Sequence, residues 1–171
     1  WVLRAYEHDP LLPYPALFVL GPFMQPERQA EFMERAARLK RVDMITFHSH
    51  LEKIVSGAAA VVGMGGYNTF CEVLSLDKRA LIVPRVRPRT EQLIRARNFR
   101  DLGLVEMLHP DEATPEAISR WLRSDGGAPP LARQRVDFLW LQRLNGFVDA
   151  RTVRRSEAAC QAAGFDHEPE S

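Results

Sequence analysis

The sequence predicts an α/β fold in which a parallel sheet is covered by helices on both faces. Short apolar runs of strand length alternate with longer stretches that show the apolar spacing of helices. Pro and Gly mark several of the boundaries between the two kinds of segment. Alternation of strands and helices along a chain is typical of parallel sheets, whose strands are buried on both faces.

Each expected strand is a short apolar run that ends where a strand is hard to continue. The run ALFVL lies between Pro15 and Gly21, the run at 59–63 ends in glycine, and the run at 80–84 ends in Pro84. The expected strands are residues 16–20, 44–47, 59–63, 80–84 and 104–107.

The expected helices carry start or stop signals. Pro26 suits a first helical turn, and Asn68 suits an N-cap. Thr114 suits an N-cap, and Pro115 after it suits the first turn of the same helix. Gly103 follows the fourth of these helices as a C-terminal cap. The expected helices are residues 26–41, 51–56, 68–76, 90–102 and 114–122.

The chain is expected to hold one main domain, residues 1–124, and an extension, residues 125–171. The extension begins with a loop, continues as a helix at 131–144 and ends in a polar tail. The segment WVLRAYEH has the pattern of a helix end without a start signal, and it begins with Trp1. We therefore expect the domain to be N-terminally incomplete and the chain to be a fragment of a longer polypeptide.

Composition excludes several classes of protein. A net charge of +1 argues against a nucleic-acid partner. Cys71 and Cys160 are too isolated for a disulfide framework or a zinc site, which favours a cytoplasmic location. No signal peptide or membrane-spanning run is evident. The helix at 131–144 pairs arginines with an apolar stripe, so it can pack on its own protein, which we favour, or lie on a membrane surface.

A glycine-rich turn is the most informative motif. The sequence GMGGYNT (63–69) joins an expected strand to an expected helix, where backbone N–H groups at the positive end of a helix dipole can hold an anion. Glu72 would repel a phosphate but can accept hydrogen bonds from a diol. The pattern suggests a nucleotide-sugar site, and the plainer alternative is a tight packing turn. The expected binding residues of the turn are Gly65, Gly66, Tyr67, Asn68 and Thr69.

Further candidates follow other expected strands. In RVRPRTEQ (85–92), Arg85, Arg87 and Arg89 can receive phosphates, or form a solvated basic loop. Glu91 and Gln92 can bind sugar hydroxyls, or complement the dipole of their helix. In TFHSH (46–50) backbone groups can contact the edge of a base. The two alternating histidines suggest a metal only weakly, and no zinc site is expected there.

Residues 16–122 resemble the C-terminal, donor-binding half of GT-B glycosyltransferases. The similarity is to the bacterial lipid-II-forming N-acetylglucosaminyltransferases and related predicted glycosyltransferases. The segments that carry it are GGYNTFCE (65–72), LIVP (81–84), EQ (91–92) and RA (95–96). Arg95 stands where the family usually has Asn.

The resemblance implies a Rossmann-like domain and a role for each matching residue. Thr69 and the turn at 65–68 would hold the diphosphate, and Glu72 would bind the ribose. Glu91 and Gln92 would contact the donor sugar, and the backbone of His48 would lie against the uracil.

The resemblance also implies the reaction: transfer of a hexose from a nucleotide-sugar, in particular a UDP-sugar, to an acceptor hydroxyl, without metal or cofactor. The acceptor site and the catalytic base would come from a separate N-terminal domain, so this chain alone is expected to be inactive. In the family a central strand precedes the helix that WVLRAYEH would end. Without that strand, unpaired edges are expected in mid-sheet.

Other functions stay open at this point. The chain can be a non-catalytic donor-binding subunit that needs a separate acceptor-domain partner. It can be a nucleotide-sugar epimerase, although no acid–base pair for that chemistry is evident in the sequence. It can also be a Rossmann-like scaffold that binds no nucleotide.

Overall fold

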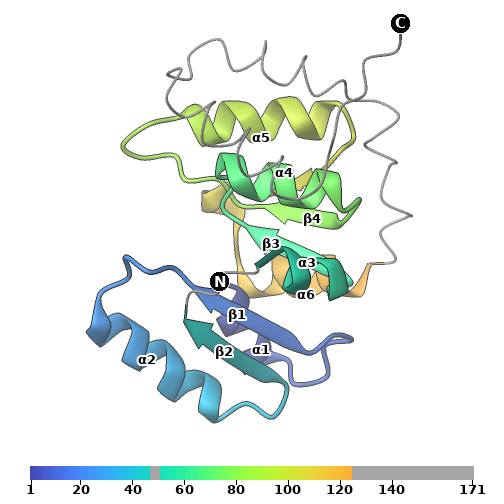
Figure 1. Ribbon diagram of the computed structural model, residues 1–171. Coiled ribbons are helices and arrows are strands. Elements are labelled where there is room, and N and C mark those ends of the chain that lie inside the picture. The colour runs from blue at the N-terminus through green and yellow to red at the C-terminus, as the bar shows by residue number, and fades with distance from the viewer. Residues whose placement is uncertain (47–50, 125–171) are drawn as a thin grey trace, which may run out of the picture. The chain divides into compact units, whose positions relative to one another are not determined.

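Helices and strands alternate along the chain, as the apolar pattern predicts (Figure 1). The computed structural model describes residues 1–46 and 51–124, which belong to the first of two units, residues 1–130. The strands are β1 (Ala16–Leu20), β2 (Val42–Thr46), β3 (Ala60–Gly63), β4 (Arg79–Ile82) and β5 (Glu106–Met107). The helices are α1 (Val2–His8), α2 (Pro26–Ala37), α3 (Leu51–Gly57), α4 (Tyr67–Ser75), α5 (Glu91–Asp101), the short 3-10 helix η1 (Pro110–Glu112) and α6 (Pro115–Arg123).

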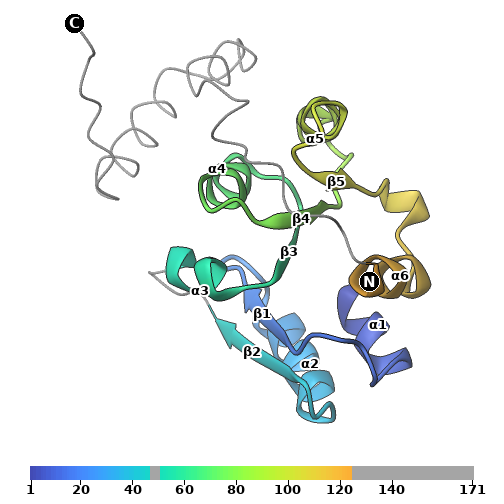
Figure 2. The same ribbon diagram turned by 90° about the vertical axis from the view of Figure 1, so that its right-hand side faces the viewer.

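All strand pairs are parallel, which confirms the predicted α/β class. The hydrogen-bonded ladder is nevertheless interrupted, because the described strands form a two-stranded sheet of β1 and β2 and a three-stranded sheet in the order β3–β4–β5. Across the strands, the order in space is β2, β1, β3, β4, so β1 lies next to β3 (Figure 1 and Figure 2). The break therefore falls between two neighbouring strands.

Helices cover both faces of the strands, as expected. On one face, apolar side chains of α1, α2 and α6 share a buried cluster with Leu81 and Val83 of the β4 segment. On the other face, Phe70 of α4 and Phe99 of α5 stack with ring centroids 4.5 Å apart, and both rings are buried. Figure 2 shows α3 and α4 on one side of the strands and α1 and α6 on the other.

Several boundaries differ from the prediction by a few residues. Strand β2 begins at Val42 because this residue is buried in the cluster and pairs with Ala16. Helix α2 ends at Ala37, where the N–H of Leu39 bonds to the carbonyl of Ala36 and turns the chain toward β2. The local cap signals of Thr114 and Gly103 are confirmed: the Thr114 hydroxyl accepts from the Ala117 N–H, and Gly103 has a φ of +71°.

The prediction that Asn68 caps α4 is wrong. The helix begins at Tyr67, and its N-cap is Gly66, whose backbone is extended with φ −62° and ψ 158°. The Gly66 carbonyl accepts the first helical hydrogen bond, from the N–H of Phe70. Asn68 consequently lies within the first turn and is exposed.

The expected helix at 131–144 and the polar tail lie outside the described residues. The two interpretations of that helix, packing on its own protein or lying on a membrane surface, therefore stay predictions. Among the described helices, none combines the length and apolar character needed to cross a bilayer.

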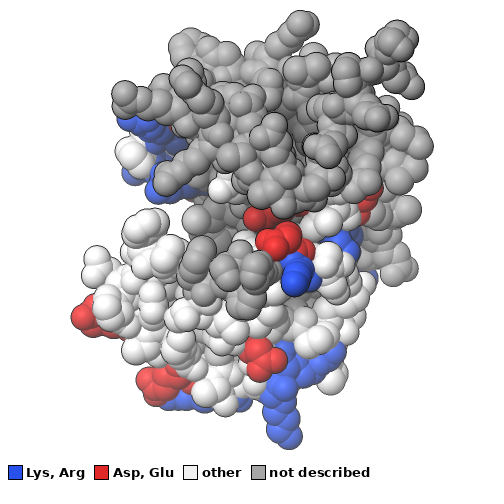
Figure 3. All heavy atoms as spheres, in the orientation of Figure 1, with Lys and Arg blue, Asp and Glu red and all other residues white. Residues whose placement is uncertain are grey.

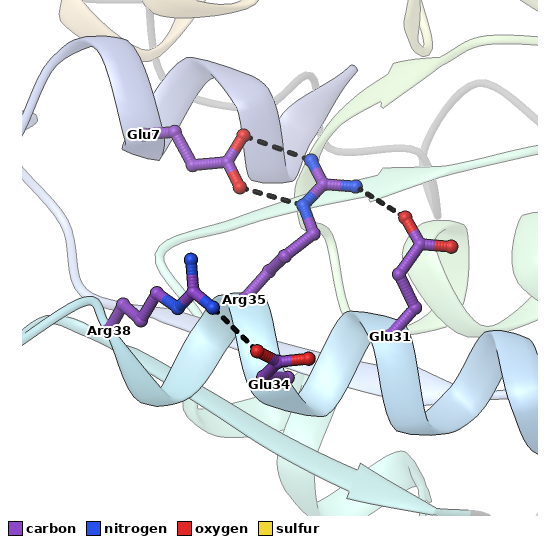
Figure 4. Close-up of polar contacts among 5 residues, drawn as sticks. All are labelled: Glu7, Glu31, Glu34, Arg35 and Arg38. Carbon is purple, nitrogen blue, oxygen red and sulfur yellow. Dashed lines mark hydrogen bonds and ion pairs between the residues drawn. The ribbon is translucent and has the colours of Figure 1, made fainter.

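Helices α1 and α2 are joined by an arginine between two carboxylates (Figure 4). Arg35 donates from Nε and Nη2 to the two oxygens of Glu7 at 2.8 and 2.9 Å, and from Nη1 to Glu31 at 3.3 Å. The hydrogen bond from Arg35 lowers the pKa of Glu7 below its ordinary value. A bidentate pair of this kind is stronger and more directional than a single contact.

Replacing Glu7 by Gln is expected to lower the free energy of unfolding by about 0.5–1 kcal/mol at pH 7, the upper range for partly exposed pairs. Because the pKa of Glu7 is lowered, its stabilisation is present above the ordinary value of 4.5 and is lost as the pH falls through the lowered value. Urea unfolding of wild type and Glu7→Gln at pH 7 and pH 2.5 measures this. The matched control is Glu34→Gln, whose pair with Arg38 is exposed on α2 alone; an equal loss in the control contradicts the account.

Candidate functional site

The carboxyl ends of β3 and β4 are held side by side. The N–H of Val83 donates to the carbonyl of Gly63 at 2.9 Å, one step beyond the last paired residues of the ladder. The turn that leaves β3 (residues 63–66) and the loop that leaves β4 (residues 83–90) therefore start from the same edge. Ligands of open α/β sheets bind at this edge.

Gly65 fixes the shape of the turn. Its φ is +79°, in the left-handed region that favours glycine. A Cβ built on it would lie 2.7 Å from Cγ2 of Ile82 and 3.2 Å from a ring carbon of Phe70. The backbone of the turn is thus pressed against β4 and α4, and no side chain fits between them.

The amino end of α4 comes directly after this glycine turn, at Tyr67. No side chain among the described residues caps it, and its first turn consists of half-buried Tyr67, exposed Asn68 and half-buried Thr69. The Thr69 methyl lies against Gly63, where an added Cβ would approach within 2.9 Å. The positive end of the helix dipole and the backbone amides of this turn make a setting suited to an anion.

Glu72 lies on the next turn of α4 and is half-buried. Burial, and secondly the negative charge of Glu52 on α3, raises the pKa of Glu72 above its ordinary value. A half-buried carboxylate close to a second acid costs stability when ionised. Two donated hydrogen bonds, such as those of a vicinal diol, would offset that cost.

The loop after β4 and the first turn of α5 carry the predicted residues Arg85, Arg89, Glu91 and Gln92. The backbone N–H of Arg85 donates to Oε1 of Gln92 at 3.1 Å, which ties the end of β4 to the first turn of α5. Arg89 and Glu91 are exposed and lie 3.9 Å from each other. Gln92 and the backbone of Arg85 therefore lie together at the end of β4, and the side chains of Arg85, Arg89 and Glu91 are exposed around them. His48 lies outside the described residues.

Two residues near this site were missed from the sequence. The guanidinium of Arg95 on α5 lies 5.9 Å from the centre of the Tyr67 ring, and so brings a positive charge to the first turn of α4. Its position three residues after Gln92 could have signalled a shared helix face. The effect of Glu52 on Glu72 depends on packing between α3 and α4, for which the sequence carries no signal.

Among the described residues visible in Figure 3, acidic and basic side chains are interspersed. Among the described residues, no group of acidic, histidine or cysteine side chains could hold a metal ion.

Residues 20–125, more than half of the chain, match the family model described as the glycosyltransferase family 28 C-terminal domain. The chain belongs to this family. None of the curated protein sequences is detectably similar to it.

Solved structures support the GT-B fold expected of a family 28 C-terminal domain. The glycosyltransferase VinC in complex with DTDP has a TM-score of 0.56 at 22% identity, covering 78% of this chain and 34% of VinC. MurG of Acinetobacter baumannii has a TM-score of 0.56 at 16% identity, covering 78% and 42%. The calicheamicin glycosyltransferase CalG4 has a TM-score of 0.53 at 20% identity, covering 96% and 39%. This family 28 domain thus spans less than half the length of the glycosyltransferases that it matches.

Replacing Gly65 by Ala is expected to destabilise the domain by about 2–4 kcal/mol, because it adds overpacking to the cost of a positive φ. Gly103→Ala is the matched control, since Gly103 has a φ of +71° but no heavy atom within 4 Å of an added Cβ. The control should lose only about 1 kcal/mol. Thermal unfolding of both variants measures the difference, and equal losses would show that the turn is not tightly packed.

Replacing Glu72 by Gln is expected to stabilise the domain at pH 7. Because the folded pKa of Glu72 is raised, the wild type loses stability as the pH rises from about the ordinary value of 4.5 through the raised value. The gain should vanish below pH 4.5, where both side chains are neutral. Denaturant unfolding at several pH values tests this, and NMR titration should show Glu52→Gln lowering the pKa of Glu72. A gain that persists unchanged at low pH contradicts it.

Proposed function

We propose that the chain is the donor-binding half of a glycosyltransferase, in which the turn at 63–69 holds the diphosphate of a nucleotide-sugar and Glu72 binds its ribose. The observation that carries the proposal is the uncapped amino end of α4, which follows a glycine turn locked at the carboxyl edge of the sheet. Membership of the glycosyltransferase family 28 C-terminal domain supports it. So does the solved structure of VinC, which holds DTDP, a nucleoside diphosphate.

The proposed chemistry follows from the polarity of this edge. Amides of Gly66 and of the first turn of α4 donate to the diphosphate, and the helix dipole stabilises the charge that develops as the sugar departs. Arg95 on α5 adds a positive charge beside Tyr67. An acceptor hydroxyl attacks the anomeric carbon while the bond to the diphosphate breaks.

The sugar and base ends of the donor are assigned to flanking segments. Gln92 and Glu91, at the start of α5, bind hydroxyls of the donor sugar, and Arg85 and Arg89 assist at the phosphates. The backbone of His48 contacts the base. A UDP-sugar is the proposed donor.

The acceptor site and the catalytic base are assigned to a separate acceptor domain, in the same polypeptide or in a partner subunit. The chain spans 34–42% of VinC, MurG and CalG4, which supports a division of this kind. Alone, the chain binds donor nucleotide and transfers no sugar.

Titration with UDP and with its 2′,3′-dideoxy analogue tests the ribose assignment. Two hydrogen bonds to a carboxylate give wild type a preference for UDP of about tenfold or more. In Glu72→Gln this preference should fall to near one, whereas Glu31→Gln on α2 should retain it. Calorimetry measures the affinity of wild type and of each variant for UDP and for the dideoxy analogue. A wild type that binds neither nucleotide contradicts the proposed function, and a preference unchanged in Glu72→Gln removes Glu72 from the site.

A further inference from the structure

Helices α4 and α5 meet through two successive layers of side chains. The two helices connect neighbouring parallel strands on one face of the sheet, so they run in the same direction. In the inner layer the buried rings of Phe70 and Phe99 stack. Tyr67 precedes Phe70 by one helical turn, and Arg95 precedes Phe99 by one turn. The contact between the Arg95 guanidinium and the Tyr67 ring is therefore the next layer toward the amino ends.

This register sets the position of the Arg95 charge along α4. Tyr67 is the first residue of α4, so the guanidinium lies beside the turn whose amides are proposed to hold the diphosphate. One turn further toward the amino end of α5, Gln92 is bonded to the backbone of Arg85 at the end of β4. Arg95 consequently lies between the buried aromatic layer and the strand edge.

The surroundings of Arg95 restrict its side chain. Arg95 is half-buried, and Leu93 and Ala96 beside it on α5 are buried. The Tyr67 ring offers the guanidinium an aromatic surface. An arginine whose planar group is already oriented loses less conformational freedom when it binds an oxyanion. Arg97, two residues further along the same helix, is exposed instead.

Glu72 and Arg95 lie on opposite sides of α4. Glu72 is close enough to Glu52 of α3 for the charge of Glu52 to act on it. Phe70, two residues earlier, packs against α5, and residues two apart on a helix point in nearly opposite directions. Figure 2 shows α4 between α3 and α5. If the ribose is bound at Glu72, the phosphates cross the first turn of α4 toward Arg95.

We propose that Arg95 binds the second phosphate of the nucleoside diphosphate, the one that carries the sugar, and that Tyr67 positions its guanidinium. Arg95 then makes the site select a diphosphate over a monophosphate. The inference rests on the proposed function and deepens it. The guanidinium fork matches two phosphate oxygens, and the second phosphate is also where negative charge develops as the sugar departs.

Calorimetric titration with UDP, UMP and uridine tests the inference. Arg95→Gln should weaken UDP binding about tenfold or more, because a charge-assisted pair is lost, and should leave the affinities for UMP and uridine nearly unchanged. Arg95→Lys keeps the charge without the fork and should lose about three- to fivefold for UDP alone. The matched control is Arg97→Gln, which removes the same charge from the opposite side of α5 and should bind all three ligands as wild type does.

The positioning role of Tyr67 has its own pair of variants. Tyr67→Phe keeps the ring under the guanidinium and should keep the preference of wild type for UDP over UMP. Tyr67→Leu removes the ring, and part of that preference should be lost while uridine binding is retained. Equal preferences in the two variants overturn the positioning role.

A wild type that binds UDP but does not prefer it over UMP overturns the inference. An unchanged preference in Arg95→Gln does the same, as does an equal loss in Arg97→Gln, which would indicate a general effect of charge. These results leave the proposed function standing. A wild type that binds none of the three ligands contradicts the proposed function and the inference together, so the two failures are distinguishable.

Discussion

The close approach of the backbone at Gly65 to Ile82 and Phe70 is the constraint on which the candidate site depends. It holds the turn after β3 against β4 and α4, where no side chain fits. The hydrogen bond from Val83 to Gly63 fixes the same edge from the other side. Together they place the amino end of α4 beside the loop that leads to α5. The orientation of the α4 dipole is therefore set by apolar packing and a backbone hydrogen bond, and not by charged side chains.

Stability and the proposed function oppose each other at Glu72. A half-buried acid beside Glu52 costs folding free energy at neutral pH, and a neutral side chain would avoid the cost. Elsewhere in the described chain, charged groups stabilise: Arg35 binds Glu7 across two helices, and Arg79 lies over the ring of Trp121 at 4.2 Å. A destabilising acid next to the proposed anion-binding turn is the arrangement expected where a ligand supplies hydrogen-bond donors to the acid.

Local sequence signals predicted the elements well and their assembly less well. Apolar runs gave the five strands to within a few residues, and the cap signals at Thr114 and Gly103 hold in the structure. The Asn68 cap failed because entry into α4 is set by the packing of Gly65, which no propensity describes. Likewise the exposure of Arg89 and Glu91 and the proximity of Arg95 to Tyr67 depend on contacts between distant segments. The break between β1 and β3, by contrast, agrees with the unpaired mid-sheet edges that the family resemblance implied. The predicted binding turn remains a prediction until a ligand is observed.

The most direct test of the central claim is a titration of the isotopically labelled chain with UDP, followed through its backbone amide resonances. The account predicts that the largest shifts fall on Gly65, Gly66 and the first turn of α4, and that uridine, which lacks the diphosphate, leaves those amides nearly unchanged. Saturable binding of UDP that shifts amides elsewhere and spares this turn would contradict the account.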